Sequence, residues 1–251
     1  MAASGAGAAP FGRGLETRCP ARAVTTRDNC VRLSARAIGD CVSKDVELQC
    51  RCGQVHGWLR DVSPSRVNRP LCYCDDCQAF LHYLGRADLL DEHGGTDVVQ
   101  VAPSSVTFDH GEECIVAVRL TSKGMHRWYA TCCKTPLGNT LTPAVPFIGM
   151  PLEVLRGAPT ASDRDQTFGK VRAAIMGKFA VGGPPKGSTG FPIGMIAHVA
   201  RLLLGWKLGG RAWPHPFFRK GTAAPIYPVT ILEAGEREAL RAKCGPNPTE
   251  R

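Results

Sequence analysis

The sequence lacks any apolar run long enough to cross a membrane. Its longest apolar stretch surrounds Leu202 to Leu204 and is interrupted by His198, Arg201 and Lys207, whereas a spanning helix needs about 20 predominantly apolar residues. Aromatic side chains make up only 7% of the 251 residues. The chain also has no basic helix with zinc-finger spacing and no series of stacking aromatics. We therefore expect that the chain does not span a membrane and does not recognise the bases of nucleic acids.

An apolar signal segment is also missing from the start of the sequence, which favours a reducing compartment, and we expect a cytoplasmic protein. Residues 1–44 are rich in Ala, Gly and Arg and contain Phe11 as their one aromatic residue. Such a segment buries too little apolar surface to fold by itself, so we predict a disordered extension. A transit peptide is the alternative for its arginines, although Glu16, Asp28 and Asp40 argue against it.

Cysteine, in contrast, is abundant, with 12 residues in the chain. Close spacing of thiols in a reducing compartment favours metal binding, and a disulfide framework is the alternative. Five cysteines lack ligand spacing and are interpreted as ordinary residues: Cys19, Cys30, Cys41, Cys114 and Cys244. The other seven form three groups, and we predict that all seven are Zn²⁺ ligands: Cys50 and Cys52, then Cys72, Cys74 and Cys77, then Cys132 and Cys133.

The central group holds three thiols within six residues. A structural zinc site is closed by four ligands, so three thiols leave one coordination position open. Cys77 falls in the first turn of a helix expected from about Asp76 to Leu84, where the helix dipole favours the thiolate. We therefore predict that Cys72, Cys74 and Cys77 form a metal site with one open coordination position.

Charge divides the chain into three parts. Residues 46–155 carry 9 Lys and Arg against 12 Asp and Glu, whereas residues 156–251 carry 15 against 6. Together with the cysteine pattern, this predicts an N-terminal extension over 1–44, a zinc-binding β domain over 45–155 and a basic, partly helical extension over 156–251. A basic surface can meet phosphates, nucleic acid or anionic lipid, but it is more often simply a solvated face.

Alternating apolar residues predict several short antiparallel strands in the cysteine-bearing part. Residues 46–59 are expected to form two strands around a turn at Cys52-Gly53, and 67–71 a third. The stretches 109–112 and 121–124 are expected to be hairpin-like turns. Helices are predicted over about 165–179, 193–208 and 233–243, and an irregular aromatic loop over 213–218. The first two helices are expected to pack on the sheet or on each other, and a membrane-surface location is the alternative.

The order and spacing of these motifs resemble the glutathione-dependent formaldehyde-activating family, whose domain is shared with centromere protein V. The resemblance covers residues 46–141 and rests on Cys-x-Cys-Gly, then Cys-x-Cys-x-x-Cys, then Arg127-Trp128-Tyr129 leading to a cysteine and Thr-Pro-Leu-Gly. It implies a mainly β, Mss4-like tent of small antiparallel sheets with zinc knuckles, to which the C-terminal helices would be appended.

The same resemblance implies that Cys50 and Cys52 hold a structural zinc and that Cys72, Cys74 and Cys77 hold a catalytic one. The third motif departs from the family pattern, which aligns Ala130 and Cys133 with the two usual ligands. Cys132 is the nearest replacement for the first of these. Because neighbouring residues of an extended chain point to opposite sides, a local twist would be needed for both cysteines to bind. Gln78 also stands where the family often has Arg.

Two functional hypotheses follow. The first is a carbon-sulfur lyase similar to S-hydroxymethylglutathione synthase, in which glutathione or its aldehyde adduct meets the three-cysteine zinc. The carboxylates of such a ligand could pair with Arg66, Arg69 or Arg127. Proton transfer by His56, His82, His126 or Tyr73 is conceivable, and we assign it to none of them. The second hypothesis is a non-catalytic zinc scaffold whose basic C-terminal part binds a partner or nucleic acid.

Overall fold

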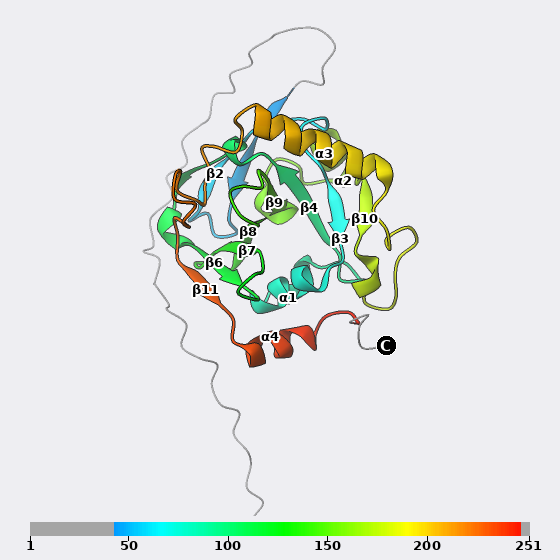
Figure 1. Cartoon of the computed structure of the whole chain (residues 1–251). Helices are drawn as coiled ribbons and strands as arrows, with labels where there is room; N and C mark the ends of the chain where they lie inside the picture. The colour runs from blue at the N-terminus through cyan, green and yellow to red at the C-terminus, as the bar shows by residue number, and fades with distance from the viewer. Residues whose placement is uncertain (1–42, 247–251) are drawn as a thin grey trace, which may run out of the picture.

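The computed structural model describes residues 43–246, and the predicted disordered extension lies almost entirely outside them. The described chain is mainly β and forms two sheets (Figure 1). The smaller sheet has the order β1 (Lys44–Gln49), β2 (His56–Val62), β5 (Val106–His110). The larger has the order β10 (Ala173–Ile175), β3 (Pro70–Cys72), β4 (Thr96–Val101), β9 (Ile148–Pro151), β8 (Thr135–Thr140), β7 (His126–Ala130), β6 (Ile115–Arg119), β11 (Val229–Ile231).

Four α-helices and five short 3-10 helices accompany the sheets within residues 43–246. The α-helices are α1 (Asp75–Tyr83), α2 (Ala161–Phe168), α3 (Ile193–Leu208) and α4 (Ala234–Arg241). The 3-10 helices are η1 (Ala87–Leu89), η2 (Pro103–Ser105), η3 (Glu112–Cys114), η4 (Leu152–Val154) and η5 (Gly177–Phe179). The predicted helix over 193–208 is therefore confirmed residue for residue, and none of the described helices is long and apolar enough to span a membrane.

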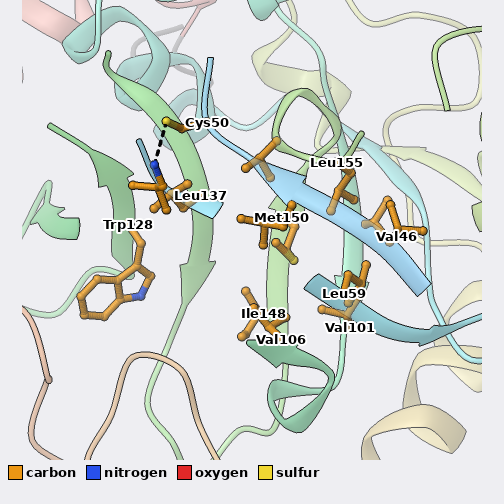
Figure 2. Packing of buried hydrophobic residues seen from close by; sticks show 14 of the residues in the cluster. Val46, Cys50, Leu59, Val101, Val106, Trp128, Leu137, Ile148, Met150 and Leu155 are labelled. Atoms are coloured by element: carbon orange, nitrogen blue, oxygen red, sulfur yellow. Dashed lines mark hydrogen bonds between the residues drawn. The ribbon is translucent and has the colours of Figure 1, made fainter. Parts of the chain in front are cut away.

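The main core lies between the two sheets (Figure 2). Alternation of apolar residues along each strand turns one side chain in two toward this space, so that Leu48 and Leu59 of the small sheet face Val101 and Met150 of the large one. These four side chains are at most 1% exposed. The cysteine groups are thus attached to a packed sandwich of strands.

The C-terminal part of the chain supplies both edges of the large sheet. Strand β10 pairs in parallel with β3, and β11 pairs in parallel with β6. Helix α4 then packs beside α1 (Figure 1). The predicted aromatic loop is also part of the core, because Phe217 stacks on Trp128 with ring centroids 4.6 Å apart. The C-terminal part of the chain, whose helices were expected to be only appended to the β part, is therefore joined to it through β10 and β11.

Two sequence-based predictions of local structure are wrong. The stretch 165–179 is not one helix: α2 ends at Phe168, Gly169 adopts a φ of +81°, and the next residues form β10. The stretch 109–112 is not a hairpin turn, because β5 belongs to the small sheet and β6 to the large one. The turn at 121–124 does join the antiparallel strands β6 and β7, and its prediction is confirmed.

Candidate metal centres

Four cysteines meet at the junction of the two sheets. Cys50 and Cys52 lie on the turn between β1 and β2, where Gly53 has a φ of +80° and donates its N–H to the Cys50 carbonyl over 3.0 Å. Such a φ is readily adopted by glycine, as the sequence predicted. Cys132 and Cys133 lie after β7, and the four sulfurs are within 4.8 Å of one another.

A tight turn resolves how two adjacent cysteines reach the same point. Strand β7 ends at Ala130, and Lys134 has a φ of +56° and donates its N–H back to the Ala130 carbonyl over 2.9 Å. The chain is thus not extended at Cys132 and Cys133, and their side chains need not alternate. The local twist that Cys132 and Cys133 need to bind the same metal is therefore present. Ala130 itself is fully buried in the main core.

The sulfur separations fit a tetrahedral metal shell. The Cys50 sulfur lies 3.6 Å from that of Cys52 and 3.9 Å from that of Cys132, which lies 3.8 Å from that of Cys133. Metal–sulfur bonds of about 2.3 Å in a tetrahedron place sulfur atoms about 3.8 Å apart. The group could therefore hold a metal ion.

Hydrogen-bonding groups lie against two sulfurs of this group. The Val55 N–H donates to the Cys50 sulfur over 3.3 Å (Figure 2), and the Thr135 hydroxyl lies 3.1 Å from the Cys133 sulfur. Hydrogen bonds from Cys132 and Cys50 hold the pKa of Cys133 well below its usual range, whereas the pKa values of Cys50 and Cys132 are raised, so Cys133 is the favoured thiolate of the group. The thiolate is the form of cysteine that binds metal.

The second group contains three cysteines, on strand β3, which pairs with the edge strand β10, and at the start of α1. Their sulfurs also lie within 4.8 Å of one another, with 4.0 Å between Cys77 and Cys72. Cys74 is the N-cap of α1, and its sulfur accepts the Cys77 N–H over 3.4 Å. The helix cap thus positions two of the three sulfurs. No fourth Cys, His, Asp or Glu of the described residues joins this group.

Comparison with known proteins identifies the family. The sequence profile of a family of unknown function (DUF6151) matches residues 42–229. The chain belongs to this family. No curated protein matches it. Among solved structures, this DUF6151 member is similar to an uncharacterised protein from Rhodobacter sphaeroides, with 15% identity and a TM-score of 0.36, over 50% of this chain and 96% of the other.

A buried cation adjoins the three-cysteine group of this DUF6151 protein. Arg127 on β7 is 2% exposed, and its Nη1 lies 3.9 Å from the Cys77 sulfur and 3.4 Å from the Asn139 Oδ1. Its Nη2 lies 3.5 Å from an Asp76 carboxylate oxygen. Hydrogen bonds from Cys72 and Cys74, followed by the charge of Arg127, hold the pKa of Cys77 well below its usual range although burial raises it.

The arginines proposed from the sequence to bind a ligand's carboxylates all have acidic partners in the structure. Arg66 pairs with Asp61, and Arg69 pairs with both Asp97 and Asp165. Arg127 is committed to Cys77 and Asp76, as described above. The sequence offered Arg127 as one of three candidates to bind a ligand's carboxylates, whereas the structure places it against Cys77 and Asp76 of α1.

None of the four proton-transfer candidates joins a cysteine group. His56 lies between Glu47 and Asp109, at 3.1 and 3.2 Å, and His126 Nδ1 contacts the Leu141 carbonyl. The Tyr73 hydroxyl donates to Asp91 over 3.1 Å, and burial raises its pKa to about 12.

Helix α4 closes one side of the three-cysteine group. Arg241 forms ion pairs with both Asp75 and Asp76, the second over 2.7 Å. The Cys244 thiol contacts the Asp75 carbonyl over 3.5 Å, and the Gly245 N–H donates to Gln78 over 2.9 Å. Gln78, where the resembling family often has Arg, therefore fastens the C-terminal segment to α1. Sequence reasoning missed this contact, which joins residues more than 160 positions apart.

Proposed function

We propose that both cysteine groups bind Zn²⁺ and that only the three-cysteine site takes a ligand. The observation that carries this proposal is the difference in sulfur number. Four sulfurs at tetrahedral separations leave no position for a ligand, whereas three sulfurs leave one open. We infer that the first site is structural and that the second binds the sulfur of a small thiol, such as glutathione or its aldehyde adduct.

Zinc supplies a fourth coordination position and lowers the pKa of a thiol bound there. The protein's own residues prepare the site for this. Asp75 and Asp76 begin α1, Cys74 caps it, and Arg127 offsets part of the negative charge of three thiolates. Because Arg127 is almost fully buried, its charge is poorly screened by water. This balance favours a site that accepts a further anionic sulfur.

The reaction that suits such a site is reversible cleavage of a hydroxymethyl thioether. The carbon–sulfur bond breaks, its electron pair remains on the sulfur, the hydroxyl proton passes to water and the carbon leaves as an aldehyde. Motif resemblance to the formaldehyde-activating family supports this choice of reaction. The alternative is a zinc scaffold without catalytic activity, in which the three-cysteine site binds no external thiol.

The purified full-length protein is expected to contain about two equivalents of Zn²⁺, one for each cysteine group. Plasma mass spectrometry after gel filtration measures this. A matched Cys244→Ser variant should contain the same amount, because Cys244 belongs to neither group. A folded preparation that holds no zinc would contradict the proposal that the two cysteine groups are zinc sites.

Thiol binding is tested on the cobalt-substituted protein, whose sulfur-to-cobalt absorption reports on the ligands. Glutathione is expected to change this absorption in a saturable manner. S-methylglutathione should not, because its sulfur cannot become a thiolate. Cys77→Ser should abolish the response, whereas Cys244→Ser should preserve it. Equal responses to both ligands, or no response to glutathione, would exclude the open zinc site and favour the scaffold.

A further inference from the structure

Helix α3 is apolar on the side that faces away from the protein. Its inner side packs through Leu202 and Trp206 against Ala102 and Phe147. Its outer side carries a stripe of exposed residues repeating every three or four positions: Ile193 (84% exposed), Ala197, Ala200, Leu204 (59%) and Leu208 (79%). A surface helix normally places polar residues there, so an apolar outer face indicates a binding surface. The helix lies at the periphery of the molecule (Figure 1).

All the charged residues in the segment that contains α3 are Lys or Arg. Residues 166–232 include nine Lys and Arg and not one Asp or Glu. Eight of the nine are exposed: Lys170, Arg172, Lys178, Lys186, Arg201, Lys207, Arg219 and Lys220. The ninth, Arg211, forms an ion pair with Asp61, and within residues 43–246 none of the other eight pairs with a carboxylate. These charges are therefore available to an anionic partner.

Cations flank the apolar stripe on both sides of α3. Helical spacing places Arg201 on one flank and Lys207 on the other, next to Leu204 and Leu208. Arg201 Nη2 also donates to the Ser65 carbonyl over 3.0 Å, so this side chain lies against the loop between β2 and β3 while it remains exposed. An apolar face bordered by cations is the pattern of helices that lie in the interface of an anionic membrane.

We propose that α3 docks on an anionic lipid surface, with the stripe from Ile193 to Leu208 entering the boundary between head groups and acyl chains. Arg201 and Lys207 would contact the lipid phosphates. Charge decides against a second copy of the chain, because pairing of two α3 faces brings cations against cations with no acidic residue of the segment to offset them. Nucleic acid would match the charges but would leave the apolar stripe exposed to water.

Co-sedimentation of the full-length protein with vesicles tests this proposal. Binding is expected to vesicles of phosphatidylcholine with phosphatidylserine and to be much weaker to phosphatidylcholine alone. The double variant Leu204→Glu/Leu208→Glu should bind at least about tenfold more weakly, because it loses two leucines that would enter the membrane. Lys207→Ala should bind roughly fivefold more weakly. Leu141→Glu, at an exposed apolar residue outside α3, is the matched control and should bind normally.

Four outcomes would overturn the proposal. The first is binding that does not depend on phosphatidylserine, and the second is binding that the double variant retains. The third is a dimer in lipid-free sedimentation velocity that the double variant dissociates, since this would assign the stripe to a second copy. Thermal melts of the variants check that they are folded, as expected for substitutions at exposed positions. The fourth is that the protein binds mixed-sequence DNA but no vesicles, and that the double variant still binds the DNA. This result would assign the cations to nucleic acid instead.

Discussion

Cys50→Ser is expected to lower the free energy of unfolding by about 4 kcal/mol and to remove one metal equivalent. Cys50 and Cys132 are 82 positions apart, and their sulfurs lie 3.9 Å from each other. A metal that joins them links the turn between β1 and β2 to the end of β7. A cross-link that closes a loop of this length contributes about 4 kcal/mol through the entropy of the unfolded chain. Because metal binding is coupled to folding, its loss is a loss of stability.

Thermal melts and metal analysis of the same samples measure this effect. For a domain of this size, the expected decrease in Tm is roughly 8–16 °C. Cys52→His is the matched control, because Cys52 is exposed and histidine nitrogen also binds zinc. It should retain the metal and most of the stability. A melting temperature of Cys50→Ser that equals that of the unsubstituted protein would show that the four-cysteine group is no structural metal site.

Cys77→Ser is expected to remove the other metal equivalent and all response to glutathione while the protein remains folded. Cys72, Cys74 and Cys77 span only six residues, which strand β3 and the start of α1 already hold in place. Loss of their metal therefore frees little additional chain. Arg127 would lose the Cys77 sulfur as a neighbour but would keep Asp76 and Asn139. The decrease in Tm should be well below that of Cys50→Ser.

The comparison requires zinc analysis, a thermal melt and the cobalt titration on each variant. Cys244→Ser is the matched control, because it removes another thiol that contacts α1. The Cys244 sulfur lies against the Asp75 carbonyl but does not belong to the three-cysteine group. It should behave like the unsubstituted protein in all three measurements. If Cys77→Ser melts as early as Cys50→Ser, the three-cysteine site is a structural staple and the division into two kinds of site is wrong.

Local sequence signals were reliable where the structure depends on neighbouring residues. The turn at Cys52-Gly53, the start of α1 near Asp76 and the whole of α3 follow from turn residues, an acidic first turn and helical periodicity. The grouping of Cys72, Cys74 and Cys77 likewise needs only a turn followed by one helix. These features are set by interactions within a few residues.

Long-range pairing decided the features that the sequence misjudged. The apolar spacing of residues 165–179 fits a helix, but residues 173–175 gain hydrogen bonds to strand β3 and become the edge strand β10 instead. Gly169 was the available signal for the end of α2, since a glycine with positive φ commonly terminates a helix. The crossing of the chain from β5 to β6 had no local signal.

The sequence by itself determined that seven cysteines form groups with ligand spacing, that the protein is mainly β, and that one group is short of a fourth thiol. Only the tertiary structure decided that Cys132 and Cys133 both join Cys50 and Cys52 and that Arg127 lies against Cys77. It also decided that the C-terminal part of the chain supplies both edge strands of the large sheet and packs against α1. The physical reason is that spacing along the chain fixes turns and helices, whereas contacts between distant residues depend on which strands pair and which faces are buried together.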